Sequence, residues 1–120
     1  MAKQTTTRHI DASLAGASPQ TIVLEAMPNN GDAATIRVRV TGRDSGTPTE
    51  VAAFVAEVAV VSDGMNATGG SQSVSLSQSA SFPGTNLNVN FSGTDVVFEA
   101  GYPGGTTIDW LIDVEVTRHA

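Results

Sequence analysis

The sequence has no cysteine and few aromatic or charged residues. The missing cysteines exclude a disulfide scaffold and a thiolate metal site. Aromatic residues make up 5% and charged residues 15% of the 120 positions, and the charged share is well below the usual fraction of about a quarter. A chain of this length has room for one domain with one core. Because small residues dominate, we expect a β-rich domain that is stabilised by packing alone.

An excess of positive charge is also missing. The formal net charge is −6, whereas binding to nucleic acid or to an anionic membrane requires a basic surface. The polar N-terminus lacks the apolar stretch of a secretion signal, and no apolar run reaches membrane-spanning length. We therefore expect a soluble protein without a nucleic-acid or membrane partner.

Residues suited to catalysis are scarce. The two histidines, His9 and His119, lie near the chain ends, where we expect solvated side chains and no oriented base of the kind that nucleophilic catalysis needs. Asp109 and Asp113 are separated by about 13 Å on an extended strand, which is too far for a glycosidase pair. No glycine cluster has the spacing of a phosphate loop. The sequence therefore predicts no enzyme activity, no cofactor and no metal site.

Several short segments alternate between apolar and polar residues. They are residues 21–27, 35–41, 73–77, 86–91, 95–100 and 107–118. Turn signals at 28–32, 83–84 and 101–105 and an expected loop at 62–71 separate them. This spacing predicts an all-β fold, an antiparallel β-sandwich or jelly roll. Period two also predicts the core, which consists of Ile36, Val38, Val40, Leu87, Val89, Phe91, Trp110, Ile112 and Val114.

Residues 47–61 fit two structures. Residues 47–50 have the form of a helix capping box with proline at the first helical position. A helix over the following residues would be apolar nearly all round, since Glu57 is the one charged residue between Val51 and Val61. We favour a strand and keep the helix as the alternative.

The N-terminal segment shows no apolar period. We interpret residues 1–20 as an extended arm that precedes a β-sandwich domain at 21–120, with a disordered terminus as the alternative. Such an arm can add its backbone to an exposed strand edge of a partner, where Lys3 and Arg8 would meet acidic groups.

Opposite charges are expected on the outward faces of two strands. Residues 1–43 carry five basic and three acidic side chains, whereas residues 44–120 carry nine acidic side chains and one basic side chain. The alternation places Arg37 and Arg39 outward on one strand, and three acidic residues outward on the last. We expect these groups to pair across neighbouring strands or across a subunit boundary. The candidate interface comprises Lys3, Arg8, Arg37, Arg39, Asp109, Asp113 and Glu115.

Two segments, Gly31–Asp44 and Gly104–Arg118, carry a resemblance to a known kind of domain. The Thr-Ile-Arg strand of the first and the Gly-Thr-Thr-Ile-Asp-Trp strand of the second resemble the opening and closing strands of a β-domain in tailed-bacteriophage virion proteins, at the ends of tail-fibre-like chains. The resemblance implies a virion structural protein that is made in the host cytoplasm, with other virion proteins as partners and a dimer or trimer as its state.

The plan of a short arm before a small β-domain is similar to that of capsid decoration, or cement, proteins. We therefore expect a decoration protein that binds the major capsid protein on the outer head surface and stabilises the shell. The alternative is a small tail or tail-fibre component with a receptor-binding or adhesive role. A third class is a carbohydrate-binding module or an enzyme, for which Tyr102 is the candidate exposed aromatic platform.

Overall fold

A computed structural model describes residues 3–15, 20–44, 46, 51–78, 86–101 and 107–119. The capping-box residues 47–50, the turn signal at 83–84 and the candidate platform Tyr102 lie outside these ranges. The described residues hold eight strands and no helix, and hence no helix that could span a membrane. The all-β prediction is confirmed.

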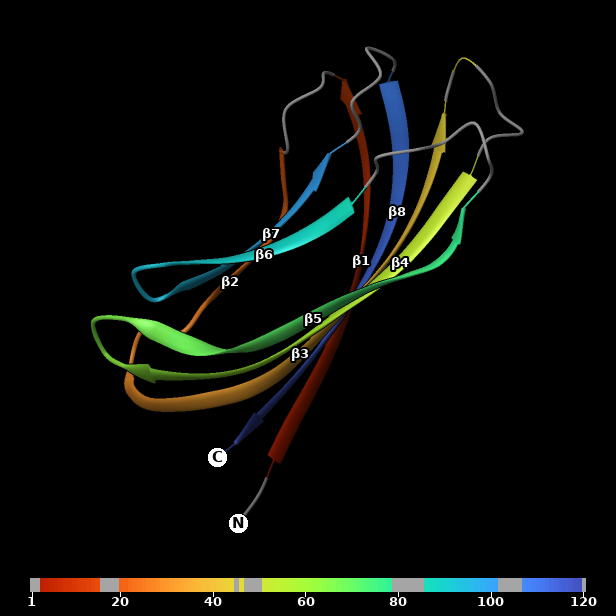
Figure 1. The fold of residues 1–120 in the computed structure, drawn as a ribbon. Coiled ribbons are helices and arrows are strands. Elements are labelled where there is room, and N and C mark those ends of the chain that lie inside the picture. Colours follow the sequence, from red (N-terminus) through yellow and green to blue (C-terminus); the bar gives the residue numbers. More distant parts are fainter. Residues whose placement is uncertain are drawn as a thin grey trace.

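The strands form two antiparallel sheets, which Figure 1 shows as separate layers. The five-stranded sheet has the order β1-β8-β3-β4-β5, and the three-stranded sheet has the order β2-β7-β6. The bounds are β1 (Lys3–Ala15), β2 (Gln20–Ala26), β3 (Asn30–Asp44), β4 (Val51–Asp63), β5 (Ala67–Gln78), β6 (Asn86–Ser92), β7 (Asp95–Gly101) and β8 (Thr107–His119). The β-sandwich is thus confirmed, and β4 is the strand that we favoured over a helix.

The core lies between the sheets and follows the predicted alternation. Ile36, Val38 and Val40 of β3 are fully buried, and β8 contributes Ile112, Val114 and the 2%-exposed Trp110. Leu87 is also buried, whereas Val89 and Phe91 are partly buried and pack against the core. The core prediction therefore holds, with the last two residues closer to the rim than expected.

Residues 3–15 of the N-terminal segment form β1, which pairs with β8 along its whole length, from Lys3 opposite His119 to Ala15 opposite Thr107. The strand edge that receives the segment thus belongs to the same chain. Ile10 and Ala12 are partly buried, and the other described side chains of β1 are exposed. Whether residues 21–120 fold without the segment stays a prediction.

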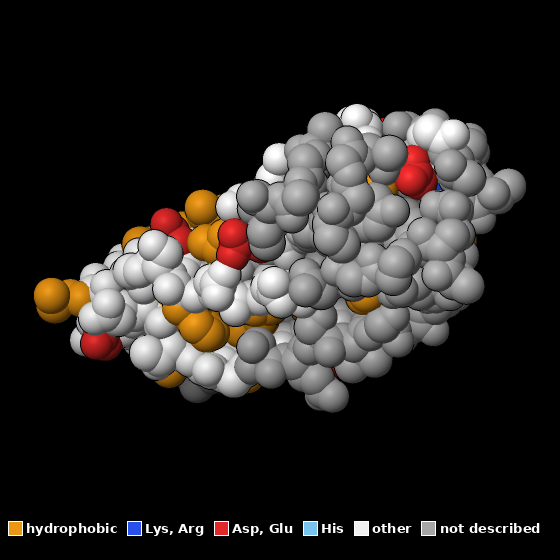
Figure 2. All heavy atoms as spheres, turned by 45° about the horizontal axis from the view of Figure 1, so that its top comes forward, with side chains coloured by type: hydrophobic (Ala, Val, Ile, Leu, Met, Phe, Trp, Pro, Cys, Tyr) orange, Lys and Arg blue, Asp and Glu red, His pale blue; other side chains and the backbone are white. Residues whose placement is uncertain are grey.

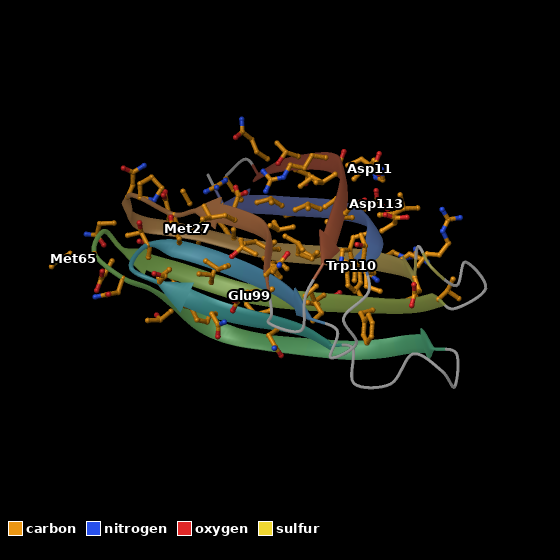
Figure 3. All side chains as sticks on the ribbon, turned by 90° about the horizontal axis from the view of Figure 1, so that it is seen from above. Asp11, Met27, Met65, Glu99, Trp110 and Asp113 are labelled. Atoms are coloured by element: carbon orange, nitrogen blue, oxygen red, sulfur yellow. The ribbon has the colours of Figure 1, made fainter. Side chains whose placement is uncertain are left out.

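The expected loop at residues 62–71 is wrong. β4 continues to Asp63 and β5 begins at Ala67, so a tight hairpin joins them, with Met65 at its tip (Figure 3). Asp63 accepts hydrogen bonds from the backbone N–H groups of Met65 (2.8 Å) and Asn66 (2.7 Å), and Gly64 adopts a φ of +88°. These backbone bonds hold the pKa of the Asp63 carboxyl below its ordinary value.

The glycines of the expected loop lie inside β5, and one of them allows close packing. A Cβ at Gly69 would overlap the carbonyl oxygen of Ala59 on β4, whereas a Cβ at Gly70 would meet open space. Glycine within a strand often marks such a close approach of two backbones. The glycine pair was therefore misread as a loop signal.

Candidate interaction surface

The odd-numbered side chains of β1, β3, β4 and β8, where the structure describes them, point away from the three-stranded sheet and form what we call the outer face. Its charged members come from all four strands and include His9, Asp11, Arg37, Arg39, Arg43, Glu57, Asp109, Asp113 and Glu115. The strand register sets them in rows across the sheet. No second layer of the described residues covers this face.

Each of three basic residues on β3 lies directly opposite an acidic residue on β8. The register pairs are Arg37 with Glu115, Arg39 with Asp113 and Arg43 with Asp109. A direct ion pair forms within one of these rows, between Arg43 and Asp109 at 3.9 Å. Arg37 instead contacts Glu57 on its other side at 3.3 Å. Within the described residues, Arg39 and Glu115 make no ion pair.

His9 links β1 to β8 on this face. Its Nδ1 lies 2.8 Å from Asp113 and its Nε2 lies 2.7 Å from Asp11, and Figure 3 shows the two aspartates side by side. The hydrogen bonds to Asp113 and then Asp11 raise the pKa of His9 above its ordinary value of 6.5. The imidazolium can donate from both ring nitrogens at once, so protonation suits this position.

A shallow depression of about 470 Å³ lies on the outer face above β8. Thr7 and His9 line it from β1, Arg37 and Arg39 from β3, and Asp113 and Glu115 from β8. A second depression of about 290 Å³ lies over β3 and β4 and is lined by small residues such as Ala33, Thr35 and Ala59. Both are open hollows with polar or small linings, which suit contact with another macromolecule.

Exposed apolar side chains lie on the same face. Leu111 of β8 is 52% exposed, and Val51 and Val61 of β4 are 40% and 49% exposed. Leu111 belongs to the row of Asp11 and Thr41, next to the rows that contain the charges. The outer face therefore combines exposed apolar area with charges of both signs.

The structure brings five of the seven predicted interface residues together on this face: Arg37, Arg39, Asp109, Asp113 and Glu115. Arg8 lies on the opposite side of the sheet, where it contacts Glu25 at 3.3 Å and the carbonyl oxygen of Leu24 at 3.2 Å. The backbone of Lys3 lies opposite His119, and its side chain is outside the description. The interface role of the seven residues stays a prediction.

The sequence reasoning missed His9, which was expected to be a solvated terminal residue. The ring is 52% exposed, yet both its nitrogens are engaged. The available signal was the run of polar residues at alternate positions of β1: Thr5, Thr7, His9, Asp11 and Ser13. Within the described residues, no group of three or more His, Asp or Glu side chains could hold a metal ion.

No protein-family model matches the chain. A search of curated proteins also found no match. Solved structures do match. The tailspike protein of Acinetobacter baumannii phage AM24 superposes with a TM-score of 0.53 at 10% identity, over 95% of this chain and 26% of the tailspike.

A second solved structure is the tailspike protein gp49 of A. baumannii bacteriophage Fri1, described as a capsular polysaccharide depolymerase. It superposes with a TM-score of 0.52 at 15% identity, over 98% of this chain and 20% of that protein. The chain thus spans 26% and 20% of the length of these two tailspikes. At these identities the likeness concerns the fold. The described β-sandwich is therefore similar to a part of two phage tailspike proteins.

Proposed function

We propose that this chain is a structural component of a bacteriophage tail, a β-sandwich unit of a spike or fibre with an adhesive role. The observation that carries the proposal is the superposition of 95% and 98% of the chain on parts of two phage tailspike proteins. The resemblance of residues 31–118 to a β-domain of tail-fibre-like chains supports the same origin independently.

The comparisons favour the tail hypothesis over the capsid-decoration hypothesis that we preferred from the sequence. Both reported neighbours are tailspikes, and the similarity to decoration proteins rested on the short arm before the domain. That segment is a strand of the five-stranded sheet, so it needs no shell to become ordered. We therefore propose other tail proteins, or further copies of the chain, as partners in the virion.

The chemistry of the outer face supports contact in preference to catalysis. The ring nitrogens of His9 both face carboxylates, so the ring cannot act as a base without giving up one of these contacts. The hydroxyl of Ser13 donates to Asp109 at 2.6 Å, so its proton is directed at a carboxylate that does not belong to a histidine-containing triad among the described residues. The absence of enzyme activity in this chain stays a prediction. One of the two matched tailspikes is described as a depolymerase, and the chain covers only part of it.

Immunogold labelling of purified phage particles tests the proposal. An antibody raised against this chain should decorate the tail, at a handful of copies per particle counted by quantitative mass spectrometry. Dense label over the head, with hundreds of copies, would support the decoration hypothesis instead. Particles without the chain would refute both.

A further inference from the structure

We propose that three copies of this chain associate around a three-fold axis that runs parallel to β3 and β8, with the outer face of each copy turned towards the axis. The inference rests on the proposed function in taking the outer face as a contact surface, and it names the partner as two further copies of the chain. The three sheets then enclose the axis as the walls of a triangular prism.

The charge register of the two central strands suits this symmetry. A three-fold axis parallel to the strands keeps each residue at its own height, so every row of the sheet meets the same row of its neighbours. β3 of one copy then faces β8 of the next copy, and this head-to-tail contact closes into a ring. In three rows the basic residue lies on β3 and the acidic residue on β8: Arg37–Glu115, Arg39–Asp113 and Arg43–Asp109. Each of these rows therefore becomes a ring of alternating basic and acidic groups.

Two central charges gain a partner in this arrangement. Among the described residues of one copy, Arg39 and Glu115 form no ion pair. Around the axis, Arg39 faces Asp113 of the next copy. Glu115 faces Arg37 of the preceding copy, so both groups meet an opposite charge.

The flanking strands meet without like charges. β4 of one copy lies beside β1 of the next copy, and the rows that the register defines decide which side chains are neighbours. The neighbours from β4 and β1 are Glu57 and Thr7, Val55 and His9, Ala53 and Asp11, and Val51 and Ser13. Each of these contacts has at least one uncharged member, so no row opposes the association.

Leu111 supplies an apolar contact at the axis. Its side chain is 52% exposed in a single copy, and its row continues to Thr41 on β3. The symmetry brings the three Leu111 side chains together between two of the charged rings. An exposed leucine in the middle of a charged sheet face is thereby covered.

The width of the outer face suits three copies. β1, β8, β3 and β4 are neighbouring strands, and four strands at a spacing of about 4.8 Å make a wall about 19 Å wide. In a triangular prism with such walls, the axis lies about 5.5 Å from each sheet, whereas packed sheets lie about 10 Å apart and each fills about half of that distance. One layer of side chains from each copy therefore fills the prism.

The depression of about 470 Å³ favours three copies over two. It lies above β8 and is lined by charged side chains such as Arg37, Arg39 and Glu115. Two copies packed flat against each other would join two hollows into an enclosed space and desolvate these charges, which is costly. Around a three-fold axis, the three hollows join into one channel that is open to water at its ends.

The opposite side of the molecule lacks this complementarity. β2, β6 and β7 carry the acidic residues Glu25, Asp95 and Glu99 and no lysine or arginine. Figure 2 views the molecule from the side of these strands, and the described charged side chains that it shows are almost all acidic. Copies that met through this side would repel each other, so the outer face is the favoured surface for self-association.

Sedimentation equilibrium of the purified chain tests the proposal. We expect a trimer at about 100 µM chain in about 0.02 M NaCl and a monomer at about 1 µM in about 0.5 M NaCl, because salt screens the charged rings. Arg39→Asp should raise the chain concentration of half-association at least about tenfold, because like charges then face each other in all three contacts. Ser92→Asp, on the exposed end of β6, is the matched control and should leave the trimer unchanged.

A mixture of two variants separates contacts between copies from effects within one copy. Asp113→Arg alone should weaken the trimer as Arg39→Asp does. In an equimolar mixture, unlike copies set opposite charges across two of the three contacts, so the mixture should associate more strongly than either variant alone. Loss of folding cannot mimic this recovery, and a mixture that stays as weak as its components would overturn the proposal.

Leu111→Cys tests the position of the axis. Three thiols near the axis can react with one short trifunctional maleimide, so we expect a covalent trimer on a denaturing gel. Ser92→Cys is the control and should give none. A chain that stays monomeric at low salt, a dimer, or equal cross-linking of the two variants would overturn the proposal. These measurements use the purified chain, so their failure would leave the tail location to be decided by the labelling of particles.

Discussion

Glu25 on β2 and Arg118 on β8 join the two sheets through an ion pair of 2.6 Å between Oε1 and Nη2. The same carboxylate contacts Arg8 of β1 at 3.3 Å, and Arg118 also donates to the carbonyl oxygen of Ala26 at 3.0 Å. The Glu25 side chain is 13% exposed. One partly buried carboxylate therefore holds the edge of the three-stranded sheet against the edge of the five-stranded sheet.

Replacement of Glu25 should loosen this connection. Glu25→Gln is expected to lower the free energy of unfolding by about 1–3 kcal/mol, because two arginines lose a charged acceptor in a partly desolvated place. Glu57→Gln is the control, since the ion pair of Glu57 with Arg37 is more than half exposed on both sides and should contribute less than about 1 kcal/mol. Urea denaturation of both variants measures the difference. Equal losses would show that Glu25 has no special role.

Trp110 and Gly42 fit against each other in the core. A Cβ on Gly42 would lie 2.6 Å from Cζ3 of Trp110, so Gly42→Ala should cost about 1–3 kcal/mol through overpacking. Trp110→Ala should cost about 3–5 kcal/mol, as expected for a buried large aromatic residue. In that background, Gly42→Ala should cost far less, because the ring that it would strike is gone. A double-mutant cycle without coupling would argue against the contact.

The neighbouring glycines of β5 should respond differently to alanine. Gly69→Ala is expected to disrupt the pairing of β4 and β5, because its Cβ would overlap the Ala59 carbonyl. Gly70→Ala has open space and should leave the melting temperature unchanged or raise it, since alanine reduces the freedom of the unfolded chain. Thermal unfolding of the two variants side by side provides the measurement. The opposite order of stabilities would refute the register at this position.

The stability of the pairing between β1 and β8 should depend on pH through His9. Because its hydrogen bonds raise the pKa in the folded chain above 6.5, the stabilisation is fully present below pH 6.5 and is lost as the pH rises through the folded pKa. We expect backbone amides of β1 to exchange faster, after correction for intrinsic rates, above that pKa. His9→Gln should abolish the difference. An NMR titration that gives His9 a pKa below 6.5 would contradict this account.

The strands that could be predicted from the sequence are those with one clearly apolar side. In β3, isoleucine and valine alternate with arginine and threonine, so the buried side was evident. β1 could not be predicted as part of the sheet, because its inward residues include Arg8 and because backbone pairing holds it. Gly69 was misinterpreted as a loop residue for a related reason. Its role is steric and depends on Ala59 of the neighbouring strand β4.

The candidate surface was predictable to a lesser degree. The outward positions of Arg37, Arg39 and the acidic residues of β8 followed from period two. The register between β3 and β8 did not follow from the sequence, since the local sequence does not fix which strands are neighbours. The contact between His9 and Asp113 joins residues that are 104 positions apart, so the polar alternation around His9 could indicate an outward side chain but not this partner.

The central claim is that the outer face is the contact surface of this chain in a phage particle. The natural sequence has no cysteine, so single cysteines can report on exposure: Thr41→Cys on the outer face, and Ser92→Cys on β6 as the control. Both positions are exposed in the isolated chain and should react fully with a maleimide. In particles that carry the variants, we expect Thr41→Cys to be protected while Ser92→Cys still reacts. Full reaction of Thr41→Cys in the particle would contradict the claim.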